Sequence, residues 1–507
     1  MSVRAAFGSD EARRAPSAWR RMAIAVFVAL FAISATGFSA AAFSETTSSP
    51  AALATQLLPM ILPATNGAAP QVKKRANDPA SCPYCQNDPA LLKAAGLVSH
   101  GGFPFGKKGN DTNKVDDFMA ANDIRWVETE HFRIGFGLGS YKVKLEDKKK
   151  ILAELTRLKL VLPKVVPDTG ILDPWLRTHI YAQRCEDIYK RFIQIIDGGT
   201  SKFADGSGTW EGRYAGEGPY LGMKEKYEAL VLPSEAAHVT FLLENAGLRI
   251  RNSQRWHFVD RGTITIMMHA EQGQLRNDAP LHGHFAFNLA HNLFDGLNHY
   301  SYDTPVWIHE GLAHFMEREI DPDHNSFDSG EGAVADMTSK GNWKPEVLKL
   351  INSGEASRMA ELMAVKSYSE LKLVHHYTTW SMIEFLITTK PAEFAKFVFA
   401  IKSNYDAQGL PTGSNLPDWH RKQFKEIFGW TYAEFDEAWR AWAQVAYGKP
   451  AAKDKDKEKE KVDPNAKGPA PAKPDPAAKG GVKEDPEGGN KPPPPTPPAP
   501  PPPGGGG

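Results

Sequence analysis

Residues 305–315 read PVWIHEGLAHF, so two histidines and a glutamate lie within an otherwise apolar segment. The proline suits a first helical turn, and the apolar pattern continues to Ile320, which predicts a helix over 305–320. On this helix Glu310 and His314 are four residues apart and share a face. His309 and His314 are five apart, about 140° around the helix, and cannot reach one ion together.

A second helix, predicted over 281–297, precedes this one and supplies His291. If His291 approaches Glu310 and His314, the three form a set of two imidazoles and one carboxylate, which is typical of zinc. Asn288 and Asp295 flank His291 on its own helix face, and with His309 they could orient these ligands by hydrogen bonds. The alternative is a buried polar network without a metal.

Other segments place these helices in a wider pattern. The early strand candidates are WVETEHFRIGF (126–136) and TITIMM (263–268), and the segments 142–160 and 175–196 have helical periodicity. The later segments HHYTTWSMIEFLITT (375–389) and FGWTYAEFDEAWRAW (428–442) are also helical. Strands come early and helices late, which predicts an α+β fold with a mainly helical C-terminal half.

These motifs together resemble the peptidase MA-like, gluzincin-type zinc metallopeptidase domains, over roughly residues 125–447. In that family, a helix with a Pro, a Trp and Glu-Gly-Leu-Ala followed by an aromatic residue provides the third zinc ligand. The resemblance implies a zincin-like fold with a small sheet, zinc as cofactor, and Glu310 as a ligand.

The helix over 281–297 departs from the family pattern. The family has His-Glu-x-x-His about 20 residues before the third ligand, and the aligned residues here are Phe287-Asn288-Leu289-Ala290-His291. Phenylalanine cannot bind a metal, and the amide of asparagine cannot take a proton from water at neutral pH. The resemblance therefore implies a degenerate, non-catalytic domain that acts in peptide or protein binding or in envelope scaffolding. The alternative is a divergent metal-dependent hydrolase that uses His291, Glu310 and His314.

A CxxC motif, Cys82-Pro83-Tyr84-Cys85, suggests a second kind of chemistry. Such a pair can form a local disulfide, a redox centre or half of a zinc site. A redox centre predicts an exposed Cys82 with a low pKa. A zinc site needs further ligands, for which Cys185 and His100 are available.

The composition divides the chain into segments. A basic, then apolar, then small-residue leader predicts a signal peptide or an N-terminal anchor, and hence an exported protein of the periplasm, cell envelope or exterior. The zero net charge gives no reason to expect nucleic-acid binding, and a membrane is involved only if the leader stays attached. The predicted segments are 1–44 (leader), 45–80 (linker), 81–124 (the Cys-containing segment), 125–280 (α+β part), 281–447 (helical part) and 448–507 (a disordered Lys/Glu then Pro/Gly-rich tail).

Overall fold

The computed structural model describes residues 77–196, 209–210, 213–300, 303–327 and 341–448. The predicted leader, nearly all of the predicted linker and the predicted tail lie outside these residues. Within the described ranges, no helix combines the length and the apolar character that a membrane crossing requires.

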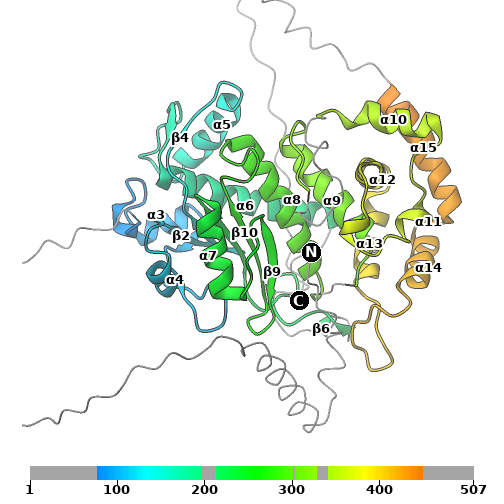
Figure 1. Ribbon diagram of the computed structural model, residues 1–507, viewed down its shortest axis with the longest axis horizontal. Coiled ribbons are helices and arrows are strands. Elements are labelled where there is room, and N and C mark those ends of the chain that lie inside the picture. Colours follow the sequence, from blue (N-terminus) through cyan, green and yellow to red (C-terminus); the bar gives the residue numbers. More distant parts are fainter. Residues whose placement is uncertain (1–76, 197–208, 211–212, 301–302, 328–340, 449–507) are drawn as a thin grey trace, which may run out of the picture. The chain divides into compact units, whose positions relative to one another are not determined.

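A six-stranded mixed sheet forms the centre of the N-terminal half (Figure 1). Its three middle strands are parallel, and the strands toward both edges are antiparallel to their neighbours. In order across the sheet the strands are β1 (Leu97–Ser99), β2 (Arg125–Thr129), β3 (Phe132–Phe136), β8 (Tyr227–Leu232), β10 (Thr263–His269) and β9 (Gln254–Phe258). Because β1 pairs with β2, the Cys-containing segment contributes to the same sheet as the residues that follow it.

The prediction of a single strand over 126–136 is wrong, because β2 and β3 form an antiparallel hairpin there. The turn is closed by polar contacts that the alternating pattern does not reveal. Thr129 accepts a hydrogen bond from the backbone of Phe132, and Glu186 of a later helix accepts one from the backbone of His131.

Helices cover both faces of the sheet, so every residue of β8 and β10 is buried. Leu230 and Leu232 of β8 pack on one face with Phe241 of α7 (Glu235–Ala246). Ala229 and Val231 face the opposite side, where α6 (Pro174–Ile196) and α8 (Asp278–Gly296) lie. Strands buried on both faces are typical of parallel sheets covered by helices.

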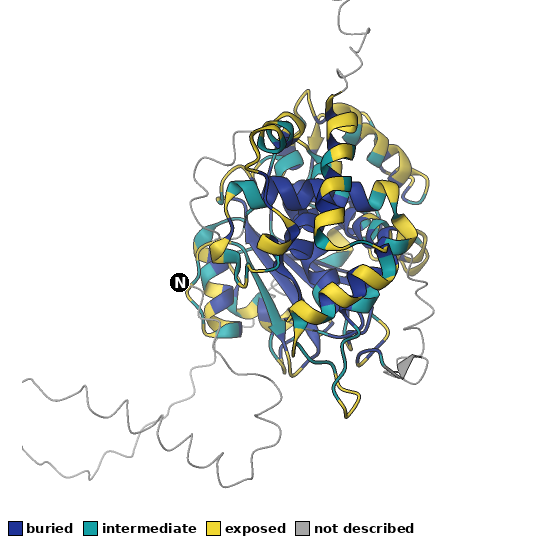
Figure 2. Cartoon of the chain, turned by 90° about the vertical axis from the view of Figure 1, so that its right-hand side faces the viewer, coloured by how far each residue is buried: buried dark blue, intermediate teal, exposed yellow. Residues whose placement is uncertain are grey.

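The named elements after β10 in the described ranges are all helices, which confirms the predicted α+β class with a mainly helical C-terminal half. Figure 2 shows that the outer helices present exposed residues around a buried interior. The helices after α8 are α9 (Val306–Ile320), α10 (Trp343–Ser353), α11 (Met359–Leu362), α12 (Leu373–Thr389), α13 (Pro391–Ile401), α14 (Leu416–Phe428) and α15 (Tyr432–Gly448). The α3 helix (Pro89–Ala94) precedes β1, α4 (Thr112–Phe118) lies between β1 and β2, and α5 (Lys148–Lys159) precedes α6. Two short pairs are β4 (Tyr141–Lys142) with β5 (Ile171–Leu172), and β6 (Thr209–Trp210) with β7 (Arg213–Tyr214).

Candidate metal centre

The α9 helix packs against both α8 and α12, and a glycine makes the second contact possible. A Cβ atom at Gly311 would lie 2.6 Å from the backbone oxygen of Thr379 and 2.6 Å from Cγ1 of Ile383. Real Cβ atoms do not approach other atoms so closely, so the backbones of α9 and α12 need glycine here. This close packing brings side chains from three helices to one point.

Glu310 lies at that point, with three imidazoles around its carboxylate. The Oε1 atom is 3.3 Å from Nε2 of His291, and Oε2 is 3.4 Å from Nδ1 of His376 and 3.6 Å from Nε2 of His314. His314 and His376 also approach each other, with 3.0 Å between Nε2 and Nδ1. All four side chains are fully buried.

The carboxylate of Glu310 is held as an anion in this interior. Burial alone would raise its pKa, but the nearby His291 and His376 outweigh burial, so the pKa lies well below the usual value. Within the described part of the chain, neither oxygen of Glu310 and neither ring nitrogen of His291 makes a hydrogen bond. Buried polar atoms normally have partners, so this group has lone pairs to offer a cation.

His314 is oriented by the carboxyl group of Glu317. Nδ1 of His314 lies 3.3 Å from Oε2 of Glu317, whose Oε1 accepts a hydrogen bond of 2.7 Å from the backbone of Ser326. This contact directs Nε2 of His314 toward Glu310. A carboxyl group behind an imidazole is a common support for a metal-binding histidine.

Glu310, His314 and His376 place one donor atom each within 4.8 Å of the others, so this buried group could hold a metal ion. His291, predicted as a ligand, contacts Glu310 through the other carboxylate oxygen. His376 was not predicted as a ligand, because the His-His-Tyr segment 375–377 is more typical of packing and hydrogen bonding than of metal binding. Only its place in the helix that resembles the family's later helix could have indicated it.

Of the residues predicted to orient the ligands, His309 stacks on His291 and approaches Asp295, whereas Asn288 bonds to other residues. Asn288 donates to the backbone oxygen of His284 and accepts from Arg255, with distances of 2.8 and 3.1 Å. The amide oxygen and nitrogen of Asn288 are therefore both used in hydrogen bonds to Arg255 and His284. The Nε2 atom of His309 is 3.6 Å from Oδ1 of Asp295, and its ring lies parallel to that of His291, with 5.7 Å between centroids.

Phe287 occupies the position where the family pattern has its first histidine. Its ring centroid lies 4.8 Å from that of His291 and 5.1 Å from that of His314. An apolar ring thus forms one wall of the cluster.

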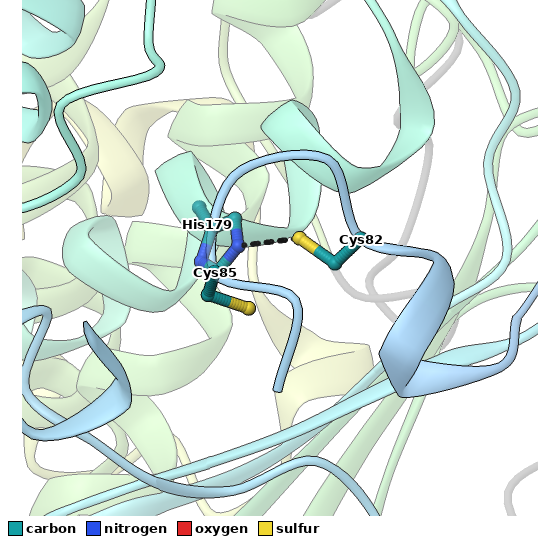
Figure 3. Close-up of side chains that lie close together, drawn as sticks. All are labelled: Cys82, Cys85 and His179. Atoms are coloured by element: carbon teal, nitrogen blue, oxygen red, sulfur yellow. Dashed lines mark hydrogen bonds between the residues drawn. The ribbon is translucent and has the colours of Figure 1, made fainter. Parts of the chain in front are cut away.

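The CxxC motif forms a second cluster, and its cysteines are free thiols, as is Cys185. The local disulfide is therefore not formed in the structure. Sγ of Cys82 lies 3.3 Å from Nε2 of His179 (Figure 3). Contact with Cys85, and to a lesser degree with His179, lowers the pKa of Cys82 to about 3. The redox hypothesis also needs an exposed Cys82, yet only 1% of it is exposed.

The chain matches no protein-family model, and a search of the curated proteins finds no match. The resemblance to gluzincin-type domains thus stays a prediction from the motifs quoted above.

Proposed function

We propose that this chain is an exported, zincin-like protein that holds zinc in the Glu310 centre and does not hydrolyse peptides. It would act in binding a peptide or protein or in scaffolding an envelope assembly. The observation that carries the proposal is the position of Asn288, where the family has its proton-accepting glutamate. Its amide is not basic, and its hydrogen bonds direct it to His284 and Arg255.

The donor set supports zinc as the metal. Imidazole nitrogens and a carboxylate are borderline ligands that suit zinc, whereas magnesium and calcium prefer oxygen alone. A bound zinc ion would neutralise the carboxylate of Glu310 and use the lone pairs of its two oxygens, which have no hydrogen bond among the described residues. His314, His376 and Glu310 would hold the ion, and Glu317 would keep the His314 ring in place.

The burial of the centre argues against substrate turnover. Catalytic zinc sites keep one coordination position open for water or substrate, and structural sites are closed by four protein ligands. Here a fourth candidate ligand, His291, contacts Glu310, and none of the four side chains is more than 1% exposed.

Metal analysis of the full chain, purified without a chelator, tests the proposal. We expect Glu310→Gln and His376→Ala each to lower the zinc content by about one ion per chain. The matched control is Glu437→Gln, on the exposed face of α15, which should keep the full content. Unchanged zinc in both site variants would refute the metal centre.

The same proteins should be incubated with denatured casein and with a mixed-peptide library. We expect no cleavage by the unaltered chain. Cleavage by the unaltered chain that disappears in Glu310→Gln would refute this proposal. It would support the alternative, a divergent metal-dependent hydrolase, whose ligands would come from the same group of three imidazoles and one carboxylate.

A further inference from the structure

The CPYC segment is folded so that both thiols point into the protein. It follows a short 3-10 helix (Pro79–Ser81), and the backbone of Gln86 donates to the oxygen of Cys82. The chain then turns through positive φ angles of 51° at Gln86 and 58° at Asn87. As residues, Cys82 and Cys85 are 1% and 0% exposed.

Tyr84, between the two cysteines, fixes this turn to the helix that carries His179. Its hydroxyl donates to the carboxylate of Asp173. The same carboxylate accepts backbone hydrogen bonds from Trp175 and Leu176 and so caps the start of α6. The loop and His179 are thereby held in a fixed relation.

Each thiol faces one imidazole. Cys82 approaches Nε2 of His179 at 3.3 Å, and Cys85 approaches Nε2 of His100 at 3.2 Å. Nδ1 of His100 lies 2.9 Å from the backbone oxygen of Trp126, so this nitrogen carries the proton and Nε2 keeps its lone pair. A backbone carbonyl behind the ring is a frequent support for a metal-binding histidine.

We propose that Cys82, Cys85, His100 and His179 form a structural zinc site, separate from the Glu310 centre. Two thiolates and two imidazoles are a common ligand set of closed, tetrahedral zinc sites. Zinc bonds of about 2.3 Å to sulfur and about 2.0 Å to nitrogen place neighbouring sulfur and nitrogen ligands about 3.5 Å apart. The two sulfur–nitrogen distances given above are within a few tenths of an ångström of this value.

The charges and the burial fit a zinc ion. Two thiolates neutralise its two positive charges, so the four buried side chains and the ion together carry no net charge. Cys82, Cys85 and His179 already lie with their donor atoms within 4.8 Å of one another. His100, which directly follows β1, contacts Cys85 through Nε2 and is the fourth candidate ligand.

The ion would join segments that are distant in the sequence. Cys82 and His179 are 97 residues apart, and His179 belongs to α6, which packs on β2 and β3. The site would therefore fasten the N-terminal segment of the described chain to the sheet and to its covering helix. Zinc here would supply the cross-link that a disulfide supplies in other exported proteins.

Cobalt substitution of the full chain tests the site, because thiolate–cobalt bonds give a charge-transfer absorption that imidazole and carboxylate ligands do not. We expect this absorption in the unaltered chain and at most about half of it in Cys85→Ala, because only the thiolate of Cys82 remains there. The matched control is Cys185→Ser, a buried cysteine outside the cluster, which should keep the absorption. Glu310→Gln should also keep it, and this separates the present site from the Glu310 centre.

A measurement on the unaltered protein avoids any loss of folding in Cys85→Ala. A thiol-specific mercurial is added stepwise while a coloured chelator reports released zinc. One zinc ion released as two thiols react would support the site. Undiminished absorption in Cys85→Ala, release of no zinc, or a Cys82–Cys85 disulfide in the purified protein would each overturn it.

Discussion

Asp278 on α8 and Arg184 on α6 form a buried ion pair that joins these two helices. Nη1 and Nη2 of Arg184 donate to the two carboxylate oxygens at 2.9 and 2.7 Å, and each side chain is 1% exposed. Arg184 also binds Glu154 of α5. Burial would raise the pKa of Asp278, but Arg184 outweighs it and keeps the pKa low. We predict that Asp278→Asn destabilises the fold strongly.

The expected loss follows from the burial of the pair. Removing one partner of a buried pair costs about 3–5 kcal/mol, because the other charge is left in an apolar interior. Glu154 remains beside Arg184 and is 14% exposed, so it compensates in part. We therefore expect a loss of about 3 kcal/mol in the free energy of unfolding.

Urea unfolding at pH 7, followed by tryptophan fluorescence, measures this loss against a matched pair. Arg157 and Asp187 have similar geometry, with distances of 3.1 and 2.6 Å, but are about half exposed. Exposed pairs contribute about 0–1 kcal/mol, so Asp187→Asn should change little. Equal losses in the two variants would show that burial does not set the strength of these contacts.

Three further outcomes follow from the structure. Gly311→Ala should lower the free energy of unfolding by about 1–3 kcal/mol and reduce the zinc content, because its Cβ would meet the backbone of Thr379. Thermal unfolding and metal analysis measure the two effects, and Gly170→Ala, with open space around its Cβ, is the control. Burial lowers the pKa of His238 from 6.5 to about 4, so the unfolded chain takes up a proton first and stability falls as the pH falls from 6.5 toward 4. Between pH 7 and pH 5, the free energy of unfolding measured in urea should therefore fall by about 2 kcal/mol less in His238→Gln than in the unaltered chain. Burial also lowers the pKa of Lys402 from 10.5 to about 7, so stability should rise from pH 7 to pH 10, and this rise should be absent in Lys402→Met.

Long amphipathic helices could be predicted from the sequence almost to the residue. The prediction over 175–196 corresponds to α6 at Pro174–Ile196, and the one over 305–320 to α9 at Val306–Ile320. In both segments the helical periodicity extends over four or more turns, so it distinguishes a helix from a strand even where a few residues fit either. The class of the fold followed from the order of such segments.

Strand β8 was not predicted, although it lies in the middle of the sheet. Its sequence, YEALVL, has no alternation of polar and apolar residues, because both of its faces are covered. A short apolar run of this kind cannot be assigned to a strand or a helix from periodicity.

The metal-capable clusters could be predicted only in part, because each depends on contacts between distant segments. Glu310 and His314 share a helix, so their spacing was sufficient to bring them together. His376 follows Glu310 by 66 residues and reaches it only because Gly311 lets α12 approach α9. His179 likewise meets the CxxC motif only through the packing of α6. The two are 97 residues apart, so no local spacing in the sequence could indicate the contact.

The positions of the two clusters explain why both proposals assign zinc a structural role. The cysteine cluster joins the N-terminal segment to α6, the Arg184–Asp278 pair joins α6 to α8, and the Glu310 cluster joins α8, α9 and α12. The cysteine cluster thus lies within the sheet half, and the Glu310 cluster lies among helices that follow the sheet. A metal that fixes helices must be enclosed by protein ligands, whereas a metal that acts on substrate must face solvent. Since both clusters are buried, their positions favour the structural role that both proposals give to zinc.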